Sequence, residues 1–277
     1  MDEELREWRE TAPYWGKHAS TIRAMFAPVT AALIEEAGVT KGRKVLDVAG
    51  GAGEPSLTIA QVVAPSGSVT FTDAIANMVS TAKAAARQKD LTNIEFQQCP
   101  ADCLPFPDNS FDVVVSRLGA MFFPDPLAAL REILRVTKPG GAVSLVVWSH
   151  SEANPFSFCV TEVVSRLIPA GDAPPTACDA FRFAERGKLA GILREAGATQ
   201  VRERLLDFDI AAPISPEQFW DLRSETSGTL REKLKSAPEE KQDRIKAEVL
   251  HNAARYFPDN QMKFPAQMLI ITGQKPG

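Results

Sequence analysis

The sequence has no apolar run that approaches the roughly 20 residues needed to cross a bilayer, and its charged start, Met1–Glu7, contains no signal-peptide stretch. It also lacks an excess of positive charge, because the formal net charge is −4 and the isoelectric point is about 5.6. Such a balance provides no general attraction to nucleic acid or to an anionic membrane. These absences predict a cytoplasmic protein with no membrane span and no nucleic-acid partner.

Cysteine and histidine are scarce as well. The four cysteines include no CxxC pair, so neither a zinc ribbon nor a redox pair is indicated: Cys99, Cys103, Cys159 and Cys178. We expect four reduced thiols and no bound metal. The three histidines leave few side chains that could act as a general base near neutral pH: His18, His150 and His251.

What the chain does contain is an alternation of short apolar strands and helices. Of its 277 residues, 44% are hydrophobic and 24% are charged, which suits a soluble protein with one large core. Strands are predicted near residues 44–49, 68–72, 94–97, 111–116, 142–148, 201–208 and 267–272. Helices between the first five strands favour a parallel sheet that is covered on both faces.

Helices are also expected before and after that region. Residues 3–37 predict two helices broken around Pro13 and Gly16. The segment Ser215–Gln218 resembles a capping box, which would open a helical insert over about 213–258. This insert could pack against the sheet or could cover a substrate.

The most informative segment is Val45–Glu54, where a buried strand runs into a glycine-rich turn. Glycine accepts a positive φ and has no Cβ, so the turn lets the backbone approach a nucleotide-like ligand above the carboxyl end of the strand. Gly51, Gly53 and Ser56 have a GxGxxS spacing that weakly imitates a dinucleotide fingerprint. Asp73, at the end of the next strand, could accept both ribose hydroxyls of an adenosine or cap a helix. Up to this point, a nicotinamide enzyme and an S-adenosylmethionine enzyme fit equally well.

Three further motifs follow the glycine turn, at Pro100–Asp112, Val113–Arg117 and Leu134–Gly141. Together with the turn they resemble the class I S-adenosylmethionine-dependent methyltransferases. The likeness is to the group that includes the ubiquinone and menaquinone C-methyltransferases and many small-molecule methyltransferases. It covers about residues 40–150 well and the remainder in outline. The resemblance implies S-adenosylmethionine as cofactor and S-adenosylhomocysteine as product.

The resemblance also implies the architecture. It predicts an α/β fold with a Rossmann-like, seven-stranded, mostly parallel sheet in a single methyltransferase domain, residues 1–277. The parts would be an N-terminal helical cap (1–40), a cofactor-binding half (41–149) and a substrate-side half (150–277) that contains the helical insert. A monomer or a homodimer is expected.

Cofactor-binding positions can be carried over motif by motif. The matching residues are Asp47, Ala49, Gly50, Gly51, Gly53, Asp73, Ala74, Met78, Ala101, Asp102, Ser116, Arg117 and Leu118. The resemblance implies that the residues from Asp47 to Gly53 surround the methionine and ribose parts of the cofactor, and that Asp73 holds the ribose hydroxyls. Met78, Ala101 and Asp102 would meet the adenine, and the segment from Ser116 to Leu118 would pass beside the methionine part.

Two residues depart from the family pattern. Ala49 stands where a first glycine is usual, and a Cβ at a positive φ costs roughly 1 to 2 kcal/mol. Pro100 stands where an adenine-binding acid is common, and Asp102 could substitute for it. These departures either change the turn or weaken the binding of the cofactor.

Methyl transfer from a sulfonium is an in-line displacement, so holding the acceptor close and aligned can supply much of the rate. No universal catalytic residue is therefore implied, although a base could help. The candidate bases are His150, His18 and Tyr14. The candidate substrate contacts are Trp15, Phe122 and Phe123. Aromatic residues also serve as core, and Arg117 could either steer an anionic acceptor or pair with an internal acid.

We therefore expect metal-independent methyl transfer from S-adenosylmethionine to an oxygen, carbon or nitrogen atom of a small molecule. One alternative is an NAD(P)-dependent oxidoreductase, which only the GxGxxS spacing and Asp73 favour. The other is a non-catalytic module that binds S-adenosylmethionine, which Ala49 and Pro100 make conceivable.

Overall fold

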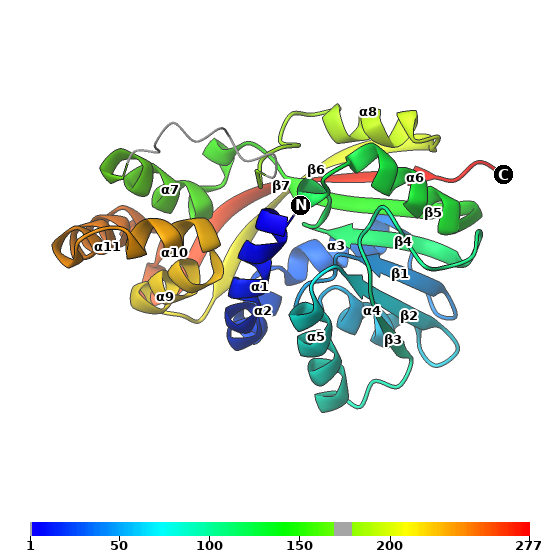
Figure 1. The fold of residues 1–277 in the computed structure, drawn as a ribbon, viewed down its shortest axis with the longest axis horizontal. Coiled ribbons are helices and arrows are strands. Elements are labelled where there is room, and N and C mark those ends of the chain that lie inside the picture. The colour runs from blue at the N-terminus through cyan, green and yellow to red at the C-terminus, as the bar shows by residue number, and fades with distance from the viewer. Residues whose placement is uncertain (1, 169–178) are drawn as a thin grey trace.

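A seven-stranded sheet forms the centre of the structure, a computed structural model that describes residues 2–168 and 179–277. Cys178, one of the four expected thiols, lies outside the described residues. The strands are β1 (Lys44–Val48), β2 (Ser68–Asp73), β3 (Ile94–Gln98), β4 (Phe111–Arg117), β5 (Thr137–Trp148), β6 (Thr199–Ala212) and β7 (Met262–Gln274). Their order is β3-β2-β1-β4-β5-β7-β6, and β7 runs antiparallel to β5 and β6 (Figure 1). The predicted Rossmann-like, mostly parallel sheet is confirmed.

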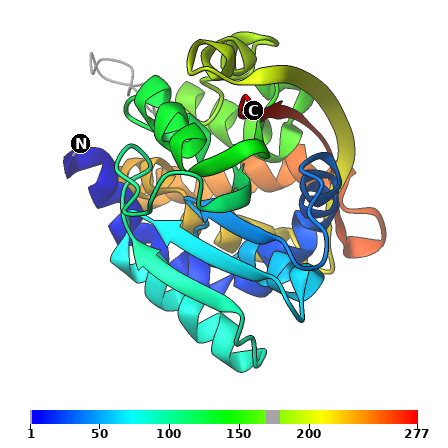
Figure 2. The same ribbon diagram turned by 90° about the vertical axis from the view of Figure 1, so that its right-hand side faces the viewer.

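The central strands consist of residues that are buried on both faces. Val45, Leu46 and Val48 of β1 are buried, as is the run Val113–Val115 of β4. Continuous apolar runs of this kind are typical of parallel strands that helices cover on both sides. Figure 2 shows helices on the two sides of the sheet.

The helices that cover the sheet follow from the connections between strands. They are α3 (Ala27–Glu36), α4 (Ser56–Val63), α5 (Ala76–Gln88), α6 (Pro126–Val136) and α8 (Lys188–Glu195). The chain moves from β1 to β2 in one direction across the sheet and from β4 to β5 in the other. Right-handed crossovers therefore place α4 and α6 on opposite faces. The reversal between β1 and β4 opens a crevice at their carboxyl ends, where α/β proteins bind ligands.

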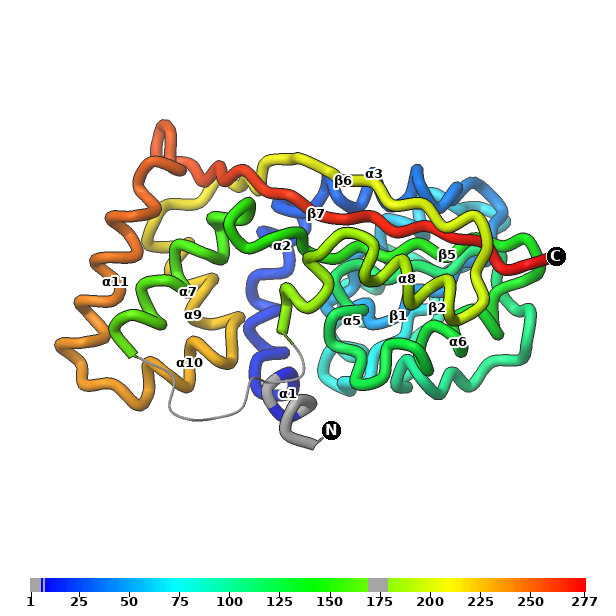
Figure 3. The backbone as a smooth tube through the Cα atoms, turned by 90° about the horizontal axis from the view of Figure 1, so that it is seen from above, coloured from blue at the N-terminus to red at the C-terminus, as the bar shows by residue number. Residues whose placement is uncertain are grey.

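A second group of helices lies beyond the carboxyl ends of the parallel strands (Figures 1 and 3). We call it the bundle: α7 (Pro155–Leu167), α9 (Pro216–Thr226), α10 (Gly228–Lys235) and α11 (Glu239–Ala253). At the start of α9, Ser215 accepts a hydrogen bond from the Gln218 N–H while the Gln218 side chain accepts one from the Ser215 N–H, which confirms the predicted capping box. Four packed aromatic rings form the centre of the bundle: Phe156, Phe219, Phe257 and Phe264.

The N-terminal region forms three helices, not the two that the sequence predicts. They are α1 (Asp2–Lys17), α2 (Ala19–Met25) and α3, and we call α1 and α2 the cap helices. The predicted break around Pro13 and Gly16 is wrong, because α1 continues through Pro13 and the chain bends at His18 and Phe26. A proline inside a helix costs about 3 kcal/mol. Since α1 packs against α5 on one side and against α9 and α10 on another, these contacts outweigh that cost.

Strand lengths also differ from the sequence prediction. β5 begins at Thr137 and not near residue 142, because a register shift opposite β4 accommodates the Lys138–Gly141 turn within the strand. β6 and β7 pair with each other along a hairpin that is longer than predicted, as far as Ala212 and Met262. β5 pairs with only part of β7. The far end of the β6–β7 hairpin therefore projects beyond the rest of the sheet, and the bundle packs around it (Figure 1).

Three cysteines lie within the described residues, and all three are free thiols: Cys99, Cys103 and Cys159. Burial raises the pKa of Cys99 and of Cys159 to about 11 each, so both thiols stay protonated at neutral pH. In the described parts of the chain, no helix combines the length and the apolar character that crossing a membrane requires.

Replacing Phe264 by Ala should lower the free energy of unfolding by about 3 to 5 kcal/mol, because the fully buried ring joins the hairpin to the other aromatic residues of the bundle. Phe158→Ala is the matched control, since the Phe158 ring is 43% exposed and its loss should cost less than about 1 kcal/mol. Urea denaturation measures both changes. Equal losses would contradict the role assigned to Phe264.

Candidate functional site

The glycine turn after β1 presents bare backbone to open space. Gly51 has φ +58°, and a Cβ built on it would meet no atom within 4 Å. Gly50 lies on the inner side of the turn, where a Cβ would come within 2.4 Å of the Phe71 ring. Gly53 has φ +116°, so the turn needs glycine there as well. The turn is therefore packed on its inner side and open on the side that Gly51 faces.

Two residues with side chains adopt the left-handed conformation at the carboxyl ends of β1 and β4. Ala49 has φ +58° and Leu118 has φ +62°. Ala49 therefore adopts a conformation that glycine reaches more easily, at a cost of about 1 to 2 kcal/mol. A Cβ on Gly119 would lie 2.6 Å from the Ala49 Cβ and 2.8 Å from the Ser116 Oγ, so the two strand ends approach as closely as a glycine allows. Backbone strain of this kind gathers at functional sites.

The carboxylate of Asp73 connects β2 to the glycine turn. Its Oδ2 accepts a hydrogen bond from the Gly51 N–H at 3.0 Å, and its Oδ1 accepts one from the Ile75 N–H at 2.9 Å. Burial raises the pKa of Asp73, against the effect of these backbone donors. Each carboxylate oxygen has a second lone pair, so the side chain can still accept from a ligand hydroxyl. Ala74 follows it and its carbonyl oxygen accepts a hydrogen bond from Gln98 at 3.1 Å.

Asp47 is a buried acid beneath the turn. Its Oδ2 accepts a hydrogen bond from the Ser56 Oγ at 2.7 Å, while its Oδ1 has no partner. Burial raises the pKa of Asp47 to about 7, although the Ser56 hydrogen bond and the charge of Arg117 act in the opposite direction. Burial therefore favours the protonated form of this carboxyl group.

Arg117 joins the glycine turn to α3. Its Nη1 donates to the Thr30 Oγ1 at 2.7 Å and its Nη2 donates to the Glu54 carbonyl oxygen at 3.2 Å. The guanidinium also lies over the ring of Phe26, with its carbon 5.7 Å from the ring centre. Burial lowers the pKa of Arg117. These contacts are made with a hydroxyl, a backbone carbonyl oxygen and an aromatic ring, and not with the internal acid suggested from the sequence.

Three buried polar atoms at this edge of the sheet have no hydrogen-bond partner: Asp47 Oδ1, Ser116 Oγ and Arg117 Nε. A buried polar group that stays unpaired costs about 1 to 3 kcal/mol. Proteins rarely keep several such groups together without a use for them. All three lie around the glycine turn, at the carboxyl ends of β1 and β4.

The adenine side of the predicted site is covered by the cap helices. Met78 is buried together with Ile75 and Ala12, and the rings of Trp8 and Trp15 pack against this group. Ala101 is half-buried and Asp102 is exposed. The sequence did not point to Trp8 or Ala12, because their contact with Met78 arises only when α1 packs on α5.

The cap residues named from the sequence contact the bundle. Trp15 Nε1 donates to the Thr226 carbonyl oxygen at 3.2 Å, and His18 Nε2 lies 2.6 Å from Glu225 Oε2. Tyr14 lies under the guanidinium of Arg231, 4.4 Å from ring centre to carbon. All three therefore lie where α1 and the turn after it meet α9 and α10.

Lys17 contacts the same acid, Glu225, as His18 does. Its Nζ lies 2.7 Å from Glu225 Oε1. Burial opposes ionisation of Glu225, but the hydrogen bonds from Lys17 and His18 prevail and lower its pKa. No local pattern in the sequence marks Glu225 as a partner, since it lies in the insert and its partners lie in the cap.

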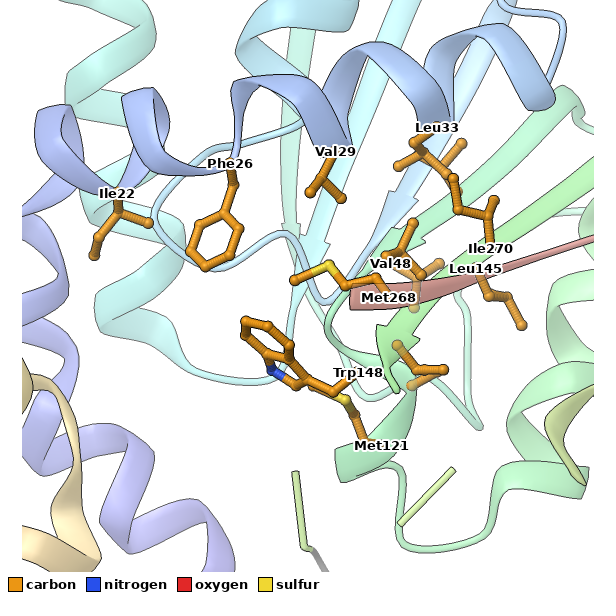
Figure 4. Packing of buried hydrophobic residues seen from close by; sticks show 14 of the residues in the cluster. Ile22, Phe26, Val29, Leu33, Val48, Met121, Leu145, Trp148, Met268 and Ile270 are labelled. Carbon is orange, nitrogen blue, oxygen red and sulfur yellow. The ribbon is translucent and has the colours of Figure 1, made fainter. Parts of the chain in front are cut away.

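Beyond β4 and β5 the site has an aromatic wall. Phe122 packs edge-on against Trp8 at 4.9 Å between ring centres, and Phe123 is buried. Trp148, at the end of β5, packs edge-on against Phe26 at 5.9 Å, and Met121 lies beside it (Figure 4). Phe122 and Phe123 were predicted from the sequence as substrate contacts, but Trp148 was not. In the sequence, Trp148 looks like another core residue of β5.

His150 follows directly after β5, and its side chain is exposed. Within residues 2–168 and 179–277, no group of three or more His, Cys, Asp or Glu side chains is arranged to hold a metal ion. The three candidate bases thus differ in their surroundings. His18 contacts the Glu225 carboxylate, Tyr14 lies under the Arg231 guanidinium, and His150 is exposed to solvent.

Solved structures with this arrangement are class I methyltransferase folds. The YcgJ protein of Bacillus subtilis is 22% identical with a TM-score of 0.56, covering 91% of this chain and 99% of that one. The phosphoethanolamine N-methyltransferase 2 of Haemonchus contortus is 17% identical with a TM-score of 0.59, covering 99% of this chain and 60% of that one. At these identities the likeness establishes the fold.

Sequence relatives define the family more narrowly. The ubiquinone/menaquinone biosynthesis C-methyltransferase UbiE of Shewanella woodyi is 38% identical over 178 residues, which is 61% of this chain and 71% of that protein. An uncharacterized protein of Mycobacterium tuberculosis is 38% identical over 134 residues, 48% of this chain and 47% of that protein, so the chain spans about half the length of that relative. A sequence model of the ubiE/COQ5 methyltransferase family matches residues 29–214, and the chain belongs to this family.

Gly119→Ala should lower the free energy of unfolding by about 1 to 3 kcal/mol, because the new Cβ would meet the Ala49 Cβ at 2.6 Å. Ala49→Gly should leave the free energy of unfolding unchanged or raise it. The substitution relieves about 1 to 2 kcal/mol of strain from the left-handed backbone, and this gain exceeds the conformational entropy that glycine loses on folding. The double variant should therefore be less destabilised than the sum of the two changes, by about 1 kcal/mol. Denaturant titration of the four proteins measures this coupling, and additivity would disprove the contact.

The raised pKa of Asp47 makes stability depend on pH. A carboxyl group whose pKa burial raises to about 7 binds its proton more tightly in the folded protein than in the unfolded chain. Its contribution is fully present below about pH 4 and is lost as the pH rises to about 7, by at most about 1.4 kcal/mol per pH unit. Asp47→Asn should remove this loss. Unfolding measured at about pH 5, 6, 7 and 8 checks it, and parallel pH profiles for the two proteins would refute the shift.

Proposed function

We propose that the protein transfers a methyl group from S-adenosylmethionine to a small-molecule acceptor. The observation that carries this proposal is the open face of the turn at Gly51, with the Asp73 carboxylate fixed behind it at the end of β2. A strand-end acid beside a bare glycine turn suits a ligand with a ribose and a charged amino-acid part. The family of the chain points to the same chemistry.

The residues present fit the cofactor. Asp73 has free lone pairs for ribose hydroxyls, and the unpaired Asp47 Oδ1 and Ser116 Oγ suit the amino-acid part. The backbone around Ala49, Gly50, Gly53 and Leu118 would shape the space, with Met78, Ala101 and Asp102 on the adenine side. When bound, S-adenosylmethionine supplies an electrophilic methyl group and remains as S-adenosylhomocysteine.

The chain's own contribution is to hold the acceptor and to exclude water. The aromatic wall of Trp148, Phe122 and Phe123 suits an apolar or flat acceptor. Trp15 and the contact between the cap helices and the bundle would close the site from the other side. A proton released from the acceptor could pass to His18, whose ring the contact between its Nε2 and Glu225 Oε2 would orient. Tyr14 and His150 are the other candidates.

We propose metal-independent transfer because β5 ends in Trp148-Ser149-His150, which does not supply the carboxylate and amide oxygens that Mg²⁺ prefers. We also propose that the protein is cytoplasmic, acts as a monomer or a homodimer, and has no nucleic-acid partner. An NAD(P)-dependent oxidoreductase and a non-catalytic module that binds S-adenosylmethionine are the alternatives that the test below separates.

Calorimetric titration with S-adenosylhomocysteine and, separately, with NADH tests the cofactor. We expect only the first to bind, and we expect Gly51→Ala to weaken it at least about tenfold, because the new Cβ would enter the space at the open face of the turn. Gly38→Ala is the matched control, since Gly38 has φ +63° and equally open surroundings but lies after α3. Both variants should lose the same 1 to 2 kcal/mol or so of stability.

Binding of NADH alone would replace the proposal with the oxidoreductase. Equal effects of the two glycine substitutions on binding would contradict the site. Binding of S-adenosylhomocysteine without methyl transfer to any acceptor in a broad screen would favour the non-catalytic module.

A further inference from the structure

The bundle contains a buried positive charge without a negative partner. Arg223 in α9 has its Nε closed off from solvent and without a hydrogen-bond partner, and among the described residues no carboxylate forms an ion pair with it. Its guanidinium carbon lies 4.8 Å from the centre of the Phe156 ring. Desolvation lowers the pKa of Arg223.

Other arginines of the chain show how such a charge is normally satisfied. Arg135 donates to the carboxylates of Glu132 and Asp108 and to two backbone carbonyl oxygens. Arg117 has two oxygen acceptors. A buried charge without a counter-charge costs more free energy than a contact with an aromatic ring recovers. Arg223 is therefore held at a net cost to stability in the described structure.

Arg223 is not wholly closed off from solvent. Arg223 as a whole is only half-buried, although its Nε is closed off. Phe156 lies in the first turn of α7, shortly after β5 ends, and it packs against Phe264 of β7. One turn beyond Arg223, the Thr226 carbonyl oxygen accepts the hydrogen bond from Trp15 of the cap. The charge thus lies in the layer that covers the carboxyl ends of the strands, on the helix that contacts the cap.

We propose that Arg223 binds an anionic group of the methyl acceptor, a carboxylate or a phenolate oxygen. This inference rests on the proposed function, since it assigns the charge of the acceptor and not the reaction. A guanidinium offers N–H donors in a planar fork that matches a carboxylate, and an apolar environment strengthens a charge-assisted hydrogen bond. The acceptor would then supply the counter-charge that the bundle lacks, and a neutral molecule of the same shape would be rejected.

Benzoate and benzamide test this preference, because they share shape and differ in charge. Each is titrated into the full-length protein with S-adenosylhomocysteine present. Benzoate should bind at least about tenfold more tightly than benzamide. Arg223→Met should remove the difference, and Arg223→Lys should keep part of it, because lysine retains the charge but not the fork. Equal binding of the two probes to the unaltered protein would overturn the inference.

Stability distinguishes a ligand-binding role from a structural one. Without ligand, Arg223→Met should unfold at the same or a higher temperature, because it removes an uncompensated buried charge. A large loss of stability together with unchanged benzoate binding would make Arg223 structural. Arg186→Met is the control, since Arg186 is 63% exposed and pairs with Glu203. It should change neither property.

Two further readouts separate the possible failures. If S-adenosylhomocysteine binds and benzoate shows no preference, this inference fails and the proposed function stands; if S-adenosylhomocysteine does not bind, both fail. Inorganic phosphate that binds as tightly as benzoate and displaces it would indicate a site for small ions and would overturn the inference. With an acceptor in hand, Arg223→Met should raise KM and leave kcat nearly unchanged.

Discussion

The hydrogen bonds that the Asp73 carboxylate accepts from Gly51 and Ile75 are the interaction on which the site depends. They fix the turn after β1 to the end of β2, so two neighbouring strands present their carboxyl ends at a constant spacing. Since the Gly51 N–H is directed inward to this acid, the bare face of the glycine stays open. A ligand would meet a preformed surface and would have little backbone to reorder.

Around that point several local costs occur close together. Ala49 and Leu118 adopt the left-handed conformation, and Asp47, Ser116 and Arg117 each keep a buried atom unpaired. The packed strands beneath them hold these positions in place. Unfavourable backbone conformations and unpaired buried atoms thus gather at one edge of the sheet, and such features gather at functional sites.

The cover over this edge is built from distant parts of the chain. α1 lies between the sheet side and the bundle, and Glu225 holds Lys17 and His18 from across that contact. Arg223 lies two residues before Glu225 on the same helix, inside the bundle. Covering the strand ends and offering a charge to an acceptor are therefore properties of one helix, α9.

The sequence by itself determined the strands, the glycine turn and the capping box at Ser215, because these follow from alternation of apolar residues and from backbone chemistry over a few positions. Tertiary structure alone decided that α1 continues through Pro13, since packing on two sides outweighs a local cost, and that β6 and β7 extend to carry the bundle. It also decided which charges are paired. Glu225 and Arg223 look alike in the sequence as exposed helical charges, but whether a charge finds a partner depends on what lies opposite it in space.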